Sequence, residues 1–276
     1  MNVEGQKPSH YSLRHHATAW VSQTLFDRFS YTVQHGLLKG MKRKGGLGWI
    51  PQSLWSPMET PEDGFWKALD MHGQVVYDVG AFHGLLTLFF ARQCRQVVCY
   101  EPNTKNNARI LENLLLNGLT NVTVRKLALG AETGVGDLIC TPLMPGTGSL
   151  ETNIVEALKR SDAPKTSEQV QISTLDRDVA ENGLPAPDFI KIDVEGLELE
   201  VLRGARNILE QCRPALFLEM HGATMDEKRR KVSEIVAWLE QNGYRRIMHV
   251  ESGSSISSSN PTIAAEGHLY CLHEMA

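Results

Sequence analysis

Residues 75–84 read VVYDVGAFHG, and this stretch decides the fold. Its first three residues favour a β-strand, Gly80 and Gly84 mark a turn, and the apolar run LLTLFFA that follows predicts a helix. A glycine turn between a strand and a helix lets a ligand approach the backbone, and the helix N-terminus offers free N–H groups to an anion. Asp78 ends the strand, where the ligand crevice of a parallel sheet lies.

The glycine spacing argues against two common nucleotide-binding motifs. The dinucleotide fingerprint G-x-G-x-x-G needs three glycines, and this turn has only Gly80 and Gly84. No Lys-Ser/Thr pair follows Gly84, so the turn is not a phosphate-binding P-loop. An NAD(P)-dependent oxidoreductase is therefore disfavoured. The pattern D-x-G-x-x-x-G from Asp78 to Gly84 is instead similar to motif I of S-adenosylmethionine (SAM)-dependent methyltransferases.

Composition limits the class of protein. The formal charge of −4 over 276 residues argues against bulk nucleic acid as the main partner. Five cysteines without a C-x-x-C pair predict reduced thiols and a cytoplasmic location. The N-terminus lacks a signal-peptide pattern, and the longest apolar run is too short for a transmembrane segment.

Alternating strand and helix patterns predict an α/β fold with a mostly parallel sheet and helices on both faces. Carboxyl and imidazole residues follow several of the strands. We expect strands at 75–79, 97–100, 122–126, 188–192, 214–219, 244–250 and 268–272, and helices at 84–93, 104–117, 196–210 and Asp226–Asn242.

The chain divides into an N-terminal helical extension, residues 1–70, and a main domain, residues 71–276. Apolar residues four apart predict a helix over Ala17–Leu38, whose apolar face covers the domain or a second subunit in a homodimer. The basic cluster Lys39–Lys44 is either a solvated turn or a site for an anionic substrate. The segment Met144–Ser149, MPGTGS, is expected to be a loop or lid.

Polar side chains stand at the carboxyl ends of four predicted strands. They are Asp78, Glu101, Asp193 and the pair Glu219 and His221. These ends meet at one rim of the sheet, where open α/β sheets bind ligands. A carboxylate after the second strand is placed to accept hydrogen bonds from a ribose diol. Because phosphate-binding glycines are missing, the nucleoside should lack a pyrophosphate, and adenosine attached to an amino acid fits.

Several longer blocks now point to one family. VYDVGAFHG, YEPN, STLDRD, FIKIDVEGLELEVLRGA and LFLEMHG together resemble the FkbM family of SAM-dependent methyltransferases over roughly residues 74–222. The resemblance implies a class I, Rossmann-like methyltransferase fold with a seven-stranded sheet. It also implies O-methylation of a hydroxyl on a sugar, glycan or small natural product. A SAM-binding regulatory or scaffold protein without catalysis is the alternative.

Within this resemblance, each site residue has an expected role. The turn from Gly80 to Gly84 would wrap the methionyl part of SAM, and Asp78 would hydrogen-bond its amino group, directly or through water. Glu101 would hold the ribose hydroxyls. The expected cofactor-binding residues are Asp78, Gly80, Ala81, Phe82, Gly84, Glu101, Pro102, Asn103, Leu127, Ala128 and Asp193.

An alcohol acceptor must lose its proton during methyl transfer. His221 has the intrinsic pKa range of a base near neutrality, and Asp193 and Glu195 are the other catalytic candidates. Alternatively, Asp193, Glu219 and His221 would hold a divalent ion, Mg²⁺ or Mn²⁺, that lowers the pKa of the acceptor hydroxyl.

Overall fold

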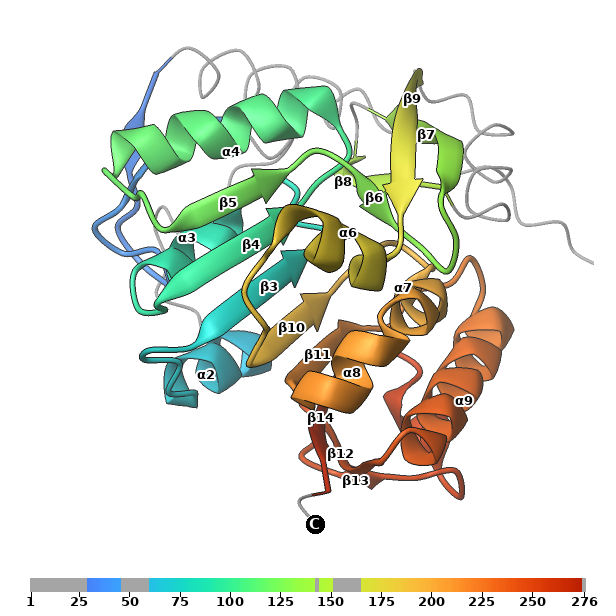
Figure 1. The fold of residues 1–276 in the computed structure, drawn as a ribbon. Coiled ribbons are helices and arrows are strands. Elements are labelled where there is room, and N and C mark those ends of the chain that lie inside the picture. Colours follow the sequence, from blue (N-terminus) through green and yellow to red (C-terminus); the bar gives the residue numbers. More distant parts are fainter. Residues whose placement is uncertain (1–28, 46–59, 142–143, 151–164, 275–276) are drawn as a thin grey trace, which may run out of the picture.

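A computed structural model describes residues 29–45, 60–141, 144–150 and 165–274. Its main sheet is built around β3 (Val75–Val79), as Figure 1 shows. The described strands are ordered β13-β12-β14-β11-β10-β3-β4-β5. Their bounds are β4 Gln96–Tyr100, β5 Val122–Arg125, β10 Phe189–Ile192, β11 Ala215–Glu219, β12 Tyr244–His249, β13 Ser255–Ile256 and β14 His268–His273.

The strand directions set the rim on which the site lies. β5, β4, β3, β10 and β11 pair in parallel, with Val79 opposite both Tyr100 and Ile192. β14 runs antiparallel between β11 and β12, which places Glu219 opposite His268. The sequence predicted these seven strands within a residue or two, and the two-residue β13 adds an eighth at the edge.

Helices cover both faces of this sheet (Figure 1). Alternate residues of β3 point to opposite faces, so Tyr77 joins the core beneath α6–α9 and Val76 the core beneath α2 and α3. Trp66 of α2 is fully buried in the second core. The helices are α2 Pro61–Ala68, α3 Leu85–Ala91, α4 Thr104–Leu116, α6 Leu175–Asn182, α7 Glu198–Gly204, α8 Arg206–Cys212, α9 Met225–Gln241 and the 3₁₀ helix η2 Pro261–Ala264.

The prediction of a single helix over residues 196–210 is wrong in one respect. The structure has two helices there, α7 and α8, separated at Ala205, whose φ of −108° and ψ of 9° are not helical. A Cβ at Gly204 would lie 2.0 Å from the carbonyl oxygen of Gly130, so this glycine allows a close backbone approach. Glycine also weakens a helix at this point.

A second sheet flanks the rim. It has the order β6-β9-β7-β8, with β6 Ala128–Leu129, β7 Gly134–Thr141, β8 Met144–Ser149 and β9 Thr166–Ser173. The prediction of a loop at Met144–Ser149 is wrong, because this segment is the strand β8 paired antiparallel with β7. Its proline and glycines favour a turn locally, but the β7 edge supplies partners that override this preference.

The described part of the N-terminal segment is a hairpin. β1 (Tyr31–Thr32) pairs with β2 (Lys42–Arg43), so the predicted helix over Ala17–Leu38 is wrong from residue 29 onward. Gly36 and Gly40 adopt positive φ and turn the chain back, and the apolar residues Val33, Leu38 and Met41 instead pack against α3 and α4.

The rest of that predicted helix, residues 17–28, lies outside the described residues, and so does most of the surface expected to form a homodimer. Among the helices of the described ranges, none combines the length and the apolar character needed to cross a bilayer.

Candidate active site

The turn after β3 brings three strand ends together. Gly80 has a φ of +79°, and a Cβ there would stand 1.7 Å from the carbonyl oxygen of Asp193, just after β10. Only glycine permits this contact between the two strand ends. Phe82 also has a positive φ, +50°, and its backbone N–H donates to the Oε2 of Glu101 at 2.8 Å. The turn is thereby tied to the residue that follows β4.

Glu101 is held by neutral donors. Besides Phe82, the backbone N–H of Asn103 (2.9 Å) and the side-chain amide of Asn106 (3.2 Å) donate to its Oε1. The side chain is buried, with only 6 % exposed. Burial raises the pKa of the Glu101 carboxyl to about 7, although these hydrogen bonds oppose the rise. The carboxyl group is thus fixed in position before any ligand arrives.

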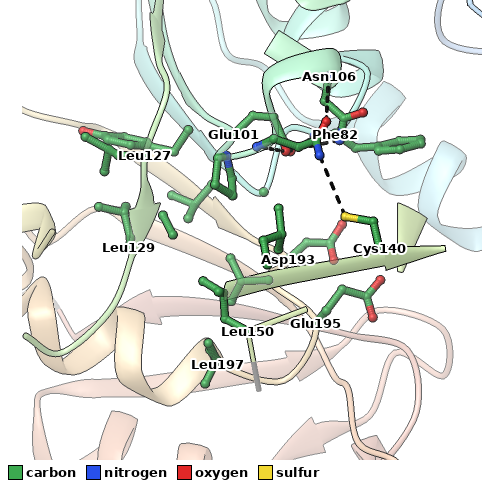
Figure 2. Close-up of a pocket in the computed structure, with 18 residues that line it drawn as sticks. Phe82, Glu101, Asn106, Leu127, Leu129, Cys140, Leu150, Asp193, Glu195 and Leu197 are labelled. Carbon is green, nitrogen blue, oxygen red and sulfur yellow. Dashed lines mark hydrogen bonds between the residues drawn. The ribbon is translucent and has the colours of Figure 1, made fainter. Parts of the chain in front are cut away.

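An open cavity lies beside Glu101 (Figure 2). Asp193 and Glu195 line it on the side across from Glu101 and Asn106, and Leu127 lines another wall. The structure therefore brings together most of the predicted site. The predicted residues in the lining are Gly80, Phe82, Glu101, Pro102, Asn103, Leu127, Ala128, Asp193 and Glu195. Residues that sequence reasoning missed are Asn106, Leu129, Leu138, Cys140, Leu150, Val194 and Leu197, among others.

Three predicted cofactor residues, Asp78, Ala81 and Gly84, are not among the lining residues in the described part of the chain. Ala81 is buried in an apolar core, and Gly84 packs against Ile110. Asp78 is fully buried and accepts a hydrogen bond from Thr87 at 2.5 Å. Asp78 thus contacts another residue of the protein, and its expected bond to SAM, direct or through water, stays a prediction.

Lys191 explains where Asp78 points. This lysine of β10 is 4 % exposed, and its Nζ lies 3.2 Å from carboxylate oxygens of both Asp78 and Asp193. It also donates to the carbonyl oxygen of Gly80 at 2.9 Å. Burial alone would lower the pKa of Lys191, but the two carboxylates raise it above its ordinary value. The sequence did contain a signal for this buried lysine, because Lys191 stands within the apolar strand sequence FIKI.

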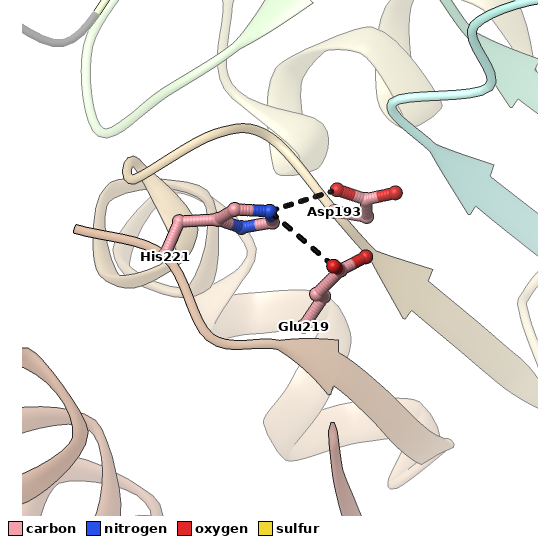
Figure 3. A group of neighbouring side chains, drawn as sticks. All are labelled: Asp193, Glu219 and His221. Carbon is pink, nitrogen blue, oxygen red and sulfur yellow. Dashed lines mark ion pairs between the residues drawn. The ribbon is translucent and has the colours of Figure 1, made fainter. Parts of the chain in front are cut away.

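His221 lies among carboxylates, as Figure 3 shows for two of them. Its Nδ1 is 2.9 Å from Glu198, and its Nε2 is 3.5 Å from Glu219 and 3.7 Å from both Asp193 and Glu195. Burial alone would lower the pKa of His221, but hydrogen bonds to Glu198 and Glu219 raise it to about 11. This raised pKa argues against His221 as a base that is neutral near pH 7, and its expected catalytic role stays a prediction.

The carboxylates around His221 differ in their protonation. Burial raises the pKa of Glu195 to about 7 and also raises that of Asp193. Burial would do the same for Glu219, but hydrogen bonds from His221 and His268 hold its pKa below the ordinary value. One atom each of Asp193, Glu219 and His221 lie within 4.8 Å of one another, a spacing that a metal ion fits.

The family model described as the methyltransferase FkbM domain matches residues 78–246, more than half of the chain. The chain belongs to the FkbM methyltransferase family. The match spans both sides of the cavity, from Asp78 to beyond His221. The predicted Rossmann-like methyltransferase fold is confirmed as well.

Individual proteins resemble this FkbM chain more distantly. Methyltransferase 1 of Beauveria bassiana is 28 % identical over 142 residues, which cover 47 % of this chain and 57 % of that protein. Hexuronic acid methyltransferase AglP of Haloferax volcanii is 30 % identical over 156 residues, covering 56 % and 58 %. The matches therefore span less than two thirds of these relatives. A solved structure, methyltransferase FkbM from Methylobacillus flagellatus KT, is 17 % identical, with a TM-score of 0.47 and coverages of 80 % and 52 %.

Proposed function

We propose that this FkbM-family protein transfers a methyl group from SAM to a hydroxyl group of a sugar, glycan or small natural product. One observation carries the proposal: a single cavity has the fixed carboxyl group of Glu101 on one side and the acidic pair Asp193 and Glu195 on the other. The first suits a ribose diol and the second an acceptor that must lose a proton.

The residues around Glu101 fit the nucleoside part of SAM. Its two oxygens already accept three hydrogen bonds and have capacity for more, so they can take bonds from ribose hydroxyls. Leu127, Ala128 and Pro102 offer apolar surface to an adenine ring. Gly80 also lines the cavity, and we assign its backbone to the methionyl part. SAM, when bound, supplies a methyl group activated by its attachment to a positively charged sulfur.

Glu195 is the residue we assign to the acceptor proton. It lines the cavity, and its pKa of about 7 lets it accept a proton near neutral pH. It has a φ of +53°, which is uncommon for a residue with a side chain and is concentrated at functional sites. His221, as a cation, orients Glu195 and Asp193 rather than acting as the base.

The family and the cavity both support a sugar-type acceptor. AglP is named a hexuronic acid methyltransferase, which supports a sugar derivative as the acceptor here. The cavity mixes carboxyl groups with leucines such as Leu150 and Leu197, which suits a molecule with both hydroxyl groups and apolar carbon surface.

A divalent ion is the second candidate for activating the hydroxyl. Asp193, Glu219 and His221 would hold Mg²⁺ or Mn²⁺, and the ion would lower the pKa of the acceptor hydroxyl. The oxygen-rich donor set fits these ions. A metal ion would bind only the deprotonated ring of His221. Hydrogen bonds to Glu198 and Glu219 stabilise the protonated ring and therefore oppose metal binding.

Calorimetry with SAM, S-adenosylhomocysteine and NAD tests the cofactor. We expect binding of the first two only. Glu101→Gln should weaken that binding at least tenfold, because charge-assisted hydrogen bonds to the ribose are worth about 1.5–3 kcal/mol each. Glu181→Gln, at an exposed position of α6, is the matched control and should bind normally. Tight binding of NAD without binding of SAM would overturn the proposal.

A further inference from the structure

The segment that forms the β1–β2 hairpin is strongly basic. Between Asp27 and Glu59 the sequence contains no aspartate or glutamate, whereas Arg28, Lys39, Lys42, Arg43 and Lys44 are cationic. A solvated turn explains the exposed Lys42. It does not explain Arg43, because that side chain is buried.

Arg43 is a buried cation whose donors are incompletely used. It is 3 % exposed, and its Nη1 donates to the hydroxyl of Tyr31 at 3.2 Å, with the guanidinium 6.0 Å from the centre of that ring. Its Nε and Nη2 are buried without a hydrogen-bond partner among the residues that the structure describes. Burial, and then the neighbouring Arg109, lower its pKa. A charge removed from water in this way is unfavourable unless an opposite charge compensates it.

Two side chains, Arg109 and His83, lie close enough to Arg43 to interact with it electrostatically. Arg109 of α4 forms an ion pair with Glu112 at 2.9 Å. The Nδ1 of His83 is also buried without a hydrogen-bond partner among the described residues. Burial, followed by Arg43 and Arg109, lowers the pKa of His83 to about 3, so its ring is neutral. Two arginines thus act electrostatically on an imidazole that has one buried nitrogen without a partner among the described residues.

Arg43, Arg109 and His83 do not line the cavity among the described residues, but His83 connects them to it. The ring of His83 stacks on Phe82 with centroids 3.9 Å apart. Phe82 and Asn106 both line the cavity. Residues 42–44 run along α4 toward its N-terminal end, because the backbone N–H of Lys42 bonds Asn117 and that of Lys44 bonds Asn113.

We propose that Arg43, together with Arg109 and His83, forms an oxyanion site that takes a carboxylate or phosphate group of a ligand in the adjoining cavity. The oxyanion would accept hydrogen bonds from the unused donors of Arg43 and supply the missing negative charge. Two sources share this chemistry: the methionyl carboxylate of the cofactor, and an acidic group on the acceptor. The first source rests on the proposed function, whereas the site itself does not.

Arg43→Met tests the site through two opposite effects on thermal stability. Without added anion, the variant should melt at the same temperature as the wild type or higher, because an uncompensated buried charge has been removed. Inorganic phosphate, compared with chloride at equal ionic strength, should stabilise the wild type and should stabilise Arg43→Met much less. Lys42→Met, at the exposed neighbouring position, should respond to phosphate as the wild type does. If Arg43→Met does not fold, Arg43→Gln replaces it.

Calorimetry then identifies the source of the anion. S-adenosylhomocysteine carries the amino-acid carboxylate, and 5′-methylthioadenosine lacks it. If Arg43 holds that carboxylate, Arg43→Met should weaken binding of the first compound at least tenfold and leave the second unchanged. A lost phosphate effect with unchanged S-adenosylhomocysteine binding would support the site and assign it to the acceptor.

The proposal is overturned if Arg43→Met changes neither the response to phosphate nor the affinity for S-adenosylhomocysteine. If the cofactor proposal is wrong, the wild type itself should bind neither S-adenosylhomocysteine nor 5′-methylthioadenosine. The comparison of phosphate with chloride would still test the Arg43 site in that case.

Discussion

The two sides of the cavity hold their carboxyl groups by different means. Glu101 accepts hydrogen bonds from uncharged donors that lie within twenty residues of it in the sequence. Asp193 and Glu195 instead lie beside the cations Lys191 and His221, which come from β10 and from the loop after β11.

The difference follows from what each side has to do. Neutral donors fix Glu101 without adding charge, which suits a group that only has to hold hydroxyls in place. On the other side, burial raises the pKa of Glu195 to about 7 even though the cation His221, 3.7 Å away, opposes the rise, whereas hydrogen bonds to carboxylates raise the pKa of His221. We infer that one side is built for binding and the other for proton transfer.

Glu195→Gln should separate the two sides most strongly. It removes the proposed base without changing the size of the side chain, so turnover should fall on the order of 10²–10⁴-fold. Affinity for S-adenosylhomocysteine should stay within about threefold of the wild type, because Glu101 is untouched. At saturating SAM, where ionisation of Glu101 does not limit cofactor binding, the wild-type kcat should rise with pH through an apparent pKa of about 7, and the variant should lose this rise. Steady-state assays from pH 5.5 to 9 measure both.

Glu200→Gln on α7, where Glu200 pairs with Arg203 at the surface, is the control for Glu195→Gln and should keep full activity. The same assay repeated in excess EDTA, and then with added Mg²⁺ or Mn²⁺, separates the base from the metal. Full turnover in EDTA removes the metal alternative. Full turnover in Glu195→Gln removes Glu195 from its assigned role and leaves Asp193 as the next carboxylate to test.

The binding side was the easier one to predict from sequence. The β3 strand, the glycine turn and Glu101 depend on local patterns, namely a continuous apolar run, two glycines and a carboxylate after a strand. The structure places Asp193 and Glu195 in the same cavity because parallel strands end at one rim, which a sequence-based topology also captures.

The features that sequence patterns did not predict depend on contacts between residues far apart in the chain. Lys191 pairs with Asp78, 113 residues earlier in the chain, and local sequence patterns do not reveal this buried ion pair. The raised pKa of His221 needs Glu198 and Glu219 to meet it in space. The β1–β2 hairpin and β8 likewise depend on partners that local propensity does not reveal.

Lys191→Met should disrupt the ion pairs among Lys191, Asp78 and Asp193. The variant leaves Asp78 fully buried without its cation, so the free energy of unfolding should fall by about 3–5 kcal/mol. Urea denaturation measures this. Adding Asp78→Asn should recover part of the loss, because the uncompensated charge is then removed. A double variant no more stable than Lys191→Met would contradict the importance of this pair.

The smallest expected effect concerns His221 and pH. Its pKa is raised from 6.5 in the unfolded chain to about 11 in the folded protein, so the folded state binds the proton more tightly. Its contribution to stability is therefore complete below pH 6.5 and is lost as the pH rises toward 11. Against His221→Gln, the wild type should be more stable by about 1.5–3 kcal/mol at pH 6.5, the worth of a hydrogen bond between charged groups. That difference should shrink at pH 8 and again at pH 9.5, as urea denaturation at each pH can show. His72→Gln, at an exposed position, should give no such trend. A difference between wild type and His221→Gln that stays constant over this range would mean that His221 is not the cation that holds the carboxylates together.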